Sequence, residues 1–144
     1  MAVPRWLLHI LWIEDRALSR ISGGRFTVPN ASGGQVRTLF LHTVGRTTGK
    51  HRRNGLYYVV DGDNLVVVAS NAGRDDDPAW WLNLQTHPDT EVEVGKERRA
   101  VHARRATADE ARPLYERFVA ALPQYDEYRR KTTREIPVVI LEPR

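Results

Sequence analysis

The sequence contains no cysteine. Disulfide bonds, zinc sites built from thiolates and a cysteine nucleophile are therefore excluded. Nothing in the chain requires an oxidising compartment, because such compartments matter chiefly for proteins held together by disulfides. We accordingly expect a cytoplasmic protein.

Histidines are few and scattered, so we expect no bound metal. No two of them lie three or four residues apart, the spacing that places two imidazoles on one helix face. The chain also lacks a recognisable nucleophile–base arrangement, paired catalytic carboxylates and the glycine fingerprint of dinucleotide-binding proteins. A hydrolase therefore has little support. The histidines are His9, His42, His51, His87 and His102.

Residues 44–54, VGRTTGKHRRN, contain no acid but several cations. Gly45 and the Gly49-Lys50 pair suggest a nucleotide phosphate loop, which needs four residues between the first glycine and Gly-Lys. Only three intervene here, and His51 follows where Ser or Thr is required. The motif is therefore excluded, and two interpretations remain. Exposed backbone amides, hydroxyls and cations could bind an anion, or the segment could be a solvated basic turn.

The composition that is present favours one globular domain. The chain has 144 residues, of which 41% are hydrophobic and 28% charged. Lys and Arg together number 22 against 18 Asp and Glu, which favours anionic partners without choosing among them.

The N-terminal segment has the pattern of an amphipathic helix over residues 4–21, followed by a Gly- and Ser-rich linker at 22–35. Its most apolar part, WLLHILWI at 6–13, is too short to span a bilayer, which needs about 20 apolar residues. The helix either packs on a domain or a sister subunit, or rests on the inner face of a membrane through Trp6 and Trp12. We therefore divide the chain into 1–35 and a folded domain at 36–144.

Within 36–144 the pattern predicts about six strands, mostly antiparallel, because Gly-containing tight turns join several of them. A helix is expected from Asp77, as N-cap, to Gln85, and it would bury Trp80 and Trp81. Such an α+β arrangement hides strand edges best as a split or closed β-barrel with inserted helices. The expected strands are 36–44, 56–60, 65–69, 90–94, 98–106 and 136–141.

Two further helices are expected near the C-terminus. Thr107 to Glu110 forms a capping box that opens a helix, which Pro113 should kink or restart. A shorter helix over 124–131 places Tyr125 and Tyr128 on one face, where both rings either line a pocket or simply pack.

A second donor-rich loop, Ala69 to Gly73, directly follows a strand. Its small residues leave backbone N–H groups accessible, and Ser70 and Asn71 add side-chain donors. This loop is either a second anion-binding loop beside the first or a polar turn before the helix expected at 77–85.

Taken together, several segments resemble the deazaflavin-dependent nitroreductase family, whose members bind coenzyme F420 on a split β-barrel. The resemblance runs from about residue 36 to the end of the chain. The segments that carry it are GRTTGKHR at 45–52, LYY at 56–58, VVVASNAG at 66–73, DPAWWLNLQTHPDTEVEVG at 77–95 and REIPVVILEP at 134–143.

This resemblance implies an 8-hydroxy-5-deazaflavin coenzyme with a phosphodiester and an oligoglutamate tail. It implies that the first loop holds the anionic tail and phosphate, and that Tyr125 and Tyr128 face the electron acceptor. Leu122 stands where relatives carry a further Tyr, which makes the acceptor pocket more apolar and leaves nitroimidazole reduction open. The implied coenzyme-binding residues are Arg46, Thr47, Thr48, Gly49, Lys50, Arg52, Tyr57, Ser70, Asn71, Ala72 and Gly73.

The leading hypothesis is an F420-dependent oxidoreductase that transfers a hydride from the reduced deazaflavin to a quinone-like, nitro or other conjugated small molecule. The alternative is a protein that stores or carries F420, or less readily FMN, without catalysis. A nucleic-acid binder is disfavoured, because the clustered arginines lack interleaved aromatic residues and the acids at 75–77 interrupt the positive field. A homodimer is expected if the first helix packs on a sister subunit.

Overall fold

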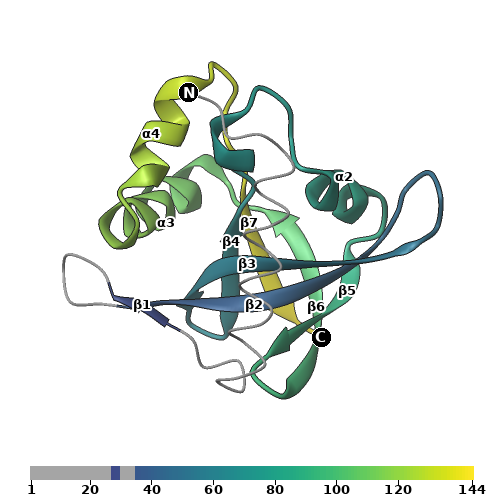
Figure 1. Ribbon diagram of the computed structural model, residues 1–144. Coiled ribbons are helices and arrows are strands. Elements are labelled where there is room, and N and C mark those ends of the chain that lie inside the picture. Colours follow the sequence, from purple (N-terminus) through teal and green to yellow (C-terminus); the bar gives the residue numbers. More distant parts are fainter. Residues whose placement is uncertain (1–26, 30–34) are drawn as a thin grey trace.

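The computed structural model describes residues 27–29 and 35–144. Strands β2 to β7 form an antiparallel barrel in the order β2-β3-β4-β7-β6-β5, and β5 closes it by pairing with β2 (Figure 1). A short strand, β1, adds to the outer side of β2. The strands are β1 (Thr27–Pro29), β2 (Gln35–Val44), β3 (His51–Asp61), β4 (Asn64–Val68), β5 (Asp89–Val94), β6 (Glu97–Arg105) and β7 (Val138–Pro143). The expected α+β split barrel is thus confirmed.

The N-terminal helix expected at 4–21 lies outside the described residues. The prediction that 22–35 is a structureless linker is wrong for Thr27–Pro29, which pairs with β2 as strand β1. Three residues are too few to show an alternating pattern, so no periodic signal marks this strand.

Two hairpins of the barrel turn at glycines with positive φ. Gly62 (φ +62°) lies in the turn between β3 and β4, and Gly95 (φ +64°) lies in the turn between β5 and β6. Both turns contain two residues, and a left-handed residue there gives the backbone twist that matches the flanking strands. Both predicted hairpins are therefore confirmed.

Strand β3 begins five residues earlier than expected, at His51 instead of Leu56. Because β2 continues to Val44, the polar residues from His51 onwards pair with its second half, down to the Val44–His51 pair. The side chains at 51–55 are mostly polar, so the sequence shows no apolar alternation there from which the strand could be predicted. The basic segment 45–53 is consequently divided into a turn at 45–50, here called the β2–β3 turn, and the start of β3, which carries Arg52 and Arg53.

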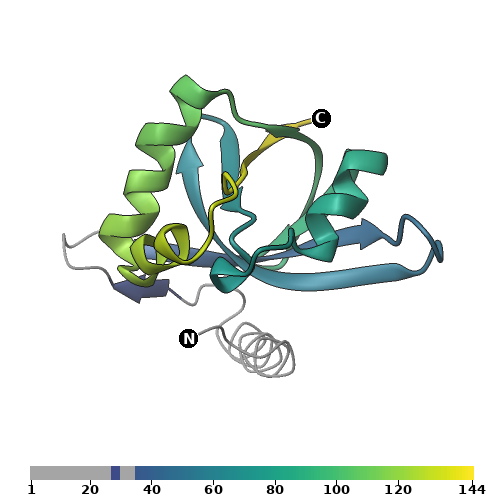
Figure 2. The same ribbon diagram turned by 90° about the horizontal axis from the view of Figure 1, so that it is seen from above.

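The sheet separates two hydrophobic clusters. In β4, Leu65 and Val67 face the barrel interior, whereas Val66 and Val68 face helix α3 on the outside, because successive side chains alternate. Helix α2 (Ala79–Thr86) adds Trp80 and Trp81 to the interior cluster, and both are buried as predicted. The helices α3 and α4 lie on one side of the barrel and α2 on the other (Figures 1 and 2).

Helix α3 (Ala108–Ala121) begins with the predicted capping box. Thr107 Oγ1 accepts from the Glu110 N–H, and the Glu110 carboxylate accepts from the Thr107 N–H. The predicted restart at Pro113 is wrong, because α3 runs through this residue without a break. Leu122 and Pro123 join α3 to α4 (Gln124–Lys131), which also matches its predicted bounds.

The predicted role of Asp77 as helix N-cap is wrong. Helix α2 begins after Pro78, and no side chain caps it. The Asp77 carboxylate instead accepts a hydrogen bond from Arg134, 57 residues further along the chain. A long-range ion pair has displaced a local capping contact that the sequence pattern alone favoured.

Candidate functional site

The β2–β3 turn is a folded loop. Its two backbone hydrogen bonds join Gly45 N to the Lys50 carbonyl and Gly49 N to the Gly45 carbonyl, both at 2.8 Å. Gly49 has φ +71°, a conformation that L side chains rarely adopt, so glycine is required at this point. Thr47, Thr48 and Lys50 are exposed on the turn.

Asn83 of α2 anchors this turn. Its Oδ1 accepts hydrogen bonds from both the Arg46 N–H, at 3.1 Å, and the Arg46 guanidinium, at 3.0 Å. Its Nδ2 donates to Thr43 Oγ1 at 3.3 Å, which secures the buried amide to β2. The turn is thus held against α2, while its remaining polar groups face solvent.

The positive charge at the turn is largely uncompensated. Lys50 and Arg52 are exposed, and no carboxylate in the part of the chain that the structure describes pairs with either one. Arg53, by contrast, donates to Glu93 at 2.9 Å. The Gly45 and Gly49 N–H groups are used inside the turn, so the prediction that these amides approach an anion is wrong. The two exposed cations and the hydroxyls of Thr47 and Thr48 remain suited to an anion.

The loop after β4 has an unusual backbone. Asn71 (φ +48°), Ala72 (φ +55°) and Gly73 (φ +79°) adopt left-handed conformations in succession, within the short helix η1 (Asn71–Gly73). For residues other than glycine such a conformation costs about 1–3 kcal/mol, and it persists only where the surroundings fix it. Ser70, Ala72 and Gly73 are buried. Strain of this kind is often stored at ligand-binding sites.

Helix α4 packs directly on this loop. A Cβ atom at Gly73 would lie 2.9 Å from Tyr128 Cα and 3.0 Å from the Tyr128 carbonyl oxygen, so only glycine fits. The loop and Tyr128 are therefore in contact through their backbones.

Tyr125 and Tyr128 lie on one face of α4, as predicted, with ring centroids 5.2 Å apart. Tyr125 is buried and packs against Phe118, and its backbone carbonyl accepts a hydrogen bond from the Tyr115 hydroxyl at 2.6 Å. Tyr128 is only partly buried. Of the two rings, Tyr125 belongs to the outer hydrophobic cluster and Tyr128 reaches its edge.

Burial raises the pKa of Tyr125, and nearby Tyr128 and Tyr57 raise it further, while a hydrogen bond with Ser70 acts against them. Burial also raises the pKa of Tyr128, followed by the effect of Tyr57. Both hydroxyls therefore stay protonated at neutral pH and can donate hydrogen bonds. These relations also show that Tyr57 of β3, Ser70 and both α4 tyrosines form one group.

The predicted site residues thus fall into two groups. Tyr57, Ser70, Asn71, Ala72, Gly73, Tyr125 and Tyr128 gather where η1 meets α4. The β2–β3 turn projects on the α2 side of the barrel (Figure 2) and carries Arg46, Thr47, Thr48, Gly49 and Lys50, with Arg52 at the adjoining start of β3. Helix α2, about 12 Å long for its eight residues, follows the first group in sequence and contacts the second through Asn83.

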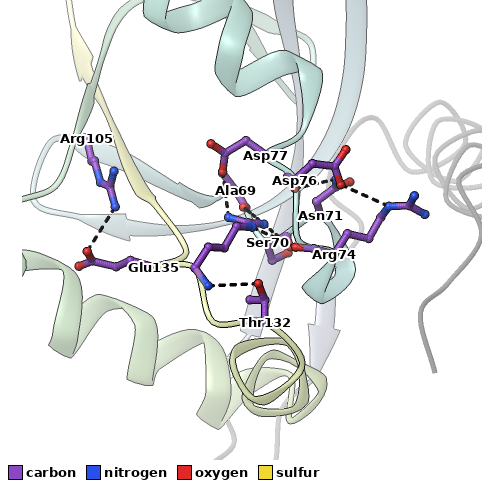
Figure 3. Close-up of polar contacts among 10 residues, drawn as sticks. Ala69, Ser70, Asn71, Arg74, Asp76, Asp77, Arg105, Thr132 and Glu135 are labelled. Atoms are coloured by element: carbon purple, nitrogen blue, oxygen red, sulfur yellow. Dashed lines mark hydrogen bonds and ion pairs between the residues drawn. The ribbon is translucent and has the colours of Figure 1, made fainter.

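Two residues that support these groups were missed from the sequence. Asn83 holds the β2–β3 turn, and Arg134 contacts the loop after β4 (Figure 3). Both are separated from their partners by more than 35 residues, so no local pattern could reveal them.

A chain of three polar side chains near the turn was also missed. His51 Nε2 lies 2.6 Å from His42 Nδ1, and His42 Nε2 lies 2.7 Å from the Glu93 carboxylate. An ionised carboxylate can only accept, so His42 donates from Nε2, and its Nδ1 accepts from His51. The residues come from β3, β2 and β5, and only the alignment of these strands brings them together.

In the described part of the chain, no group of three or more His, Asp or Glu side chains is arranged to hold a metal ion. No helix among the described residues is long and apolar enough to cross a membrane.

A family model and a named relative indicate the same family. The family model described as F420H(2)-dependent quinone reductase matches residues 16–143. The chain is 34% identical, over 98% of each sequence, to a Mycobacterium tuberculosis protein named F420H(2)-dependent quinone reductase.

Solved structures show the same fold. One described as an F420-H2 dependent reductase superposes with a TM-score of 0.66 and 32% identity, covering 73% of this chain and 93% of that chain. Another, described as a domain-swapped dimer, superposes with a TM-score of 0.68 and 27% identity, covering 91% of this chain and 97% of that chain.

Proposed function

The chain belongs to the F420H(2)-dependent quinone reductase family, and from this premise we propose how its residues divide the binding of coenzyme F420 and a quinone. The protein is an F420-dependent oxidoreductase, and coenzyme F420 is its cofactor. Neither the family nor the named relative favours a non-catalytic carrier.

The residues present fit this coenzyme. When bound, the reduced deazaflavin supplies the hydride that reduces the acceptor. The phosphodiester and oligoglutamate tail need cations and hydroxyl donors, which the β2–β3 turn offers without a neighbouring acid in its sequence. The ring needs a closely approaching backbone, which the left-handed residues of η1 provide.

We assign the anionic tail and phosphate to the β2–β3 turn and β3. Lys50 and Arg52 supply the charge, and the hydroxyls of Thr47 and Thr48 supply donors beside them, while Gly49 provides the left-handed bend of the turn. Arg46 is partly engaged by Asn83, which aims the turn and leaves its other guanidinium donors available.

We assign the deazaflavin end to the group around η1. Tyr57 and the segment 70–73 lie beside α4, whose Tyr125 and Tyr128 complete the group. The two groups are separate, and only one of them carries the exposed cations, an arrangement that suits a ligand with its charge at one end.

Tyr128 is the residue that orients the acceptor. Its hydroxyl is protonated at neutral pH, because burial raises its pKa, and it is less buried than Tyr125. It can therefore donate a hydrogen bond to the quinone oxygen on which negative charge develops. The neighbouring Tyr125 holds Tyr128 in place through ring packing at 5.2 Å.

A quinone is the acceptor class, and we extend this to nitro and other conjugated molecules. Leu122 lies buried beside the tyrosines in the outer cluster, which favours an apolar acceptor. Such acceptors dissolve in lipid, so we place the protein in the cytoplasm, with the apolar segment 6–13 on the inner membrane face. Assembly as a homodimer is supported by the similar structure described as a domain-swapped dimer.

The direct test is a titration of the purified protein with F420, FMN and FAD, followed by fluorescence. We expect F420 to bind at micromolar concentration or below and the flavins to bind much more weakly, since neither carries an oligoglutamate tail. Rapid mixing of the reduced complex with menadione should then oxidise the coenzyme above the background rate. A carrier would bind F420 without this oxidation.

The combined variant Lys50→Ala, Arg52→Ala tests the site assignment. Removing two cations that contact the tail should raise the coenzyme Kd roughly ten- to a hundredfold, the equivalent of about 1–3 kcal/mol. The effect should be largest at low salt, where charge is least screened. The matched control is Lys96→Ala, Arg117→Ala, which removes the same charge from exposed positions elsewhere.

F420 lacking the glutamate tail sharpens this test. The two cation variants should bind this shortened coenzyme with more nearly equal affinity, because the contacts to the glutamates are absent in both. Equal affinity of the two variants for the full coenzyme would contradict the assignment of Lys50 and Arg52, without contradicting F420 as the cofactor.

A further inference from the structure

The left-handed loop after β4 needs an external support. Asn71 and Ala72 have positive φ although neither is glycine. Within the loop, Gly73 N donates to the Ser70 carbonyl and Arg74 N to the Asn71 carbonyl. Asn71 Nδ2 also donates to the Asp76 carbonyl at 3.0 Å. All of these contacts lie within residues 70–76, and a strained backbone persists only where its surroundings also fix it.

Arg134 supplies contacts on both sides of the strained residues. Its Nη2 donates to the carbonyls of Ser70, at 3.0 Å, and Ala69, at 3.3 Å, and its Nε donates to the Arg74 carbonyl at 2.9 Å. One guanidinium therefore joins the chain before and after Asn71 and Ala72. Figure 3 labels its partners Ala69, Ser70, Arg74 and Asp77.

The guanidinium is itself held in place. Its Nη1 donates to Asp77 Oδ1 at 2.8 Å, and the side chain is only 16% exposed. The backbone N–H of Arg134 donates to Thr132 Oγ1 at 3.2 Å, which fixes the segment between α4 and β7 (Figure 3). A planar fork with several donors fits this geometry, whereas a lysine ammonium could not reach all three carbonyls.

The opposite side of the loop meets α4. Gly73 lies against the backbone of Tyr128, and Ala69 N donates to the Pro137 carbonyl at 2.9 Å. Arg134 and Tyr128 thus hold the left-handed backbone from different sides.

We infer that Arg134 is a positioning residue that holds residues 69–74 in the shape that receives the deazaflavin end of the coenzyme. This inference rests on the proposed function, since it needs that loop to contact the coenzyme ring. Arg134 acts through the loop carbonyls, and its charge is neutralised by Asp77. Its effect on affinity should therefore be one of shape and not of charge.

The test compares Arg134→Lys with Arg104→Lys. Arg104 makes a comparable two-pronged ion pair with Glu110, at 2.8 Å for each contact, but lies outside both site groups. Arg134→Lys should raise the Kd of F420 about tenfold or more, and raise that of F420 lacking the glutamate tail by the same factor. The increase should not depend on salt. Arg104→Lys should lower Tm and leave both Kd values unchanged.

These readouts separate positioning from general stability. Kd is measured well below the Tm of each variant, where a merely structural arginine would leave affinity unchanged. If Arg134→Lys does not fold, Asp77→Asn decides the matter, because it keeps the arginine but frees its guanidinium to rotate. It should raise both Kd values about threefold.

Two failures can be told apart. If the unaltered protein does not bind F420, the proposed function itself is contradicted. If it binds F420 and a folded Arg134→Lys variant, or Asp77→Asn in its place, binds within twofold of it, then only the inference about Arg134 is overturned.

Discussion

At the scale of single residues, Tyr125 and Tyr128 show how two identical side chains on one helix face differ in their use. Tyr125 is packed among Phe118, Tyr115 and Tyr128, and its carbonyl is tied to the Tyr115 hydroxyl. Tyr128 shares the face but keeps part of its surface open. Tyr125 is therefore suited to a packing role, whereas the partly exposed Tyr128 is accessible to a substrate.

Tyr128→Phe should therefore lower the quinone turnover number by about tenfold to a hundredfold while the F420 Kd stays within twofold of the unaltered protein. The ring and its packing remain, and only the hydroxyl that donates to the quinone is lost. The expected decrease in turnover is at or somewhat below the usual effect of losing one such donor. Steady-state kinetics with menadione and a fluorescence titration provide the two measurements.

Tyr58→Phe is the matched control for this variant. Tyr58 follows Tyr57 in β3 but is buried in the interior cluster, away from α4. A loss of turnover equal in both variants would contradict the assignment of Tyr128.

Residue roles were predictable where the contact is local. The capping pair Thr107 and Glu110 is three residues apart and forms as expected. Asp77 was misassigned, because its true partner Arg134 is 57 residues away. Asn83 and Arg134 could not be found from sequence for the same reason.

At the scale of elements, the chain His51–His42–Glu93 links β3, β2 and β5. It lies beside the Phe40–Glu93 pair, where β2 and β5 close the barrel. Burial lowers the pKa of His42 below its ordinary value, partly opposed by Glu93 and reinforced by Arg98 and His51. Burial alone would raise the pKa of Glu93, but hydrogen bonds from Arg53 and His42 bring it below its ordinary value.

The stability of the barrel closure should therefore fall in acid. A histidine whose folded pKa lies below the unfolded value of about 6.5 stabilises the fold fully above that pH and progressively loses this contribution as pH falls. The lowered pKa of Glu93 has the same sign and acts at still lower pH. Tm should thus drop between pH 7.5 and 5.5, and His42→Gln should make this drop smaller.

His102→Gln is the control for this measurement. His102 also contacts a carboxylate, Asp89, at 2.6 Å, but that contact is solvent-exposed. The His102→Gln variant should retain the drop in Tm between pH 7.5 and 5.5. An identical pH profile for His42→Gln and the unaltered protein would contradict a role for His42 in the closure.

Elements marked by local chemistry were predicted well, whereas the start of β3 and strand β1, which depend on pairing with β2, were not. Gly62 and Gly95 mark their hairpins, and α4 has its expected bounds. The early start of β3 at His51 depends on the length of β2, its partner. Strand β1 consists of three residues that pair with the edge of β2, so it is defined by this pairing and not by a local pattern.

At the scale of the whole molecule, one sheet serves two hydrophobic clusters. Val139 and Leu141 of β7 face the interior, while Val138 and Ile140 face α3 and α4. Near-continuous apolar strands are expected where both faces are covered. The barrel is therefore stabilised from inside, whereas the proposed site wall depends on the outer cluster.

Phe118→Ala and Leu141→Ala separate these contributions. Both side chains are fully buried, Phe118 in the outer cluster and Leu141 in the interior one. Each substitution should lower the free energy of unfolding by about 2–5 kcal/mol, as measured by urea denaturation. Only Phe118→Ala should also lower quinone turnover, because the Phe118 ring packs against Tyr125.

The whole-molecule fold was recognisable from its sequence, since hairpins, helix starts and apolar runs occur in the right order. The cluster that each side of a strand would join could not be predicted, because β2 is buried on both faces between Thr38 and Thr43.

The prediction for Phe118→Ala and Leu141→Ala has a clear contrary outcome. Equal turnover for the two variants at matched stability would contradict the separation of the two clusters.

The contact of Gly73 with Tyr128 joins two parts of the proposed site. Because a Cβ atom at Gly73 would lie 2.9 Å from Tyr128 Cα, helix α4 and η1 have no room to approach each other. A displacement of the Tyr128 backbone toward η1 would therefore displace the loop as well. The residue assigned to the acceptor and the loop assigned to the deazaflavin are mechanically coupled in this way.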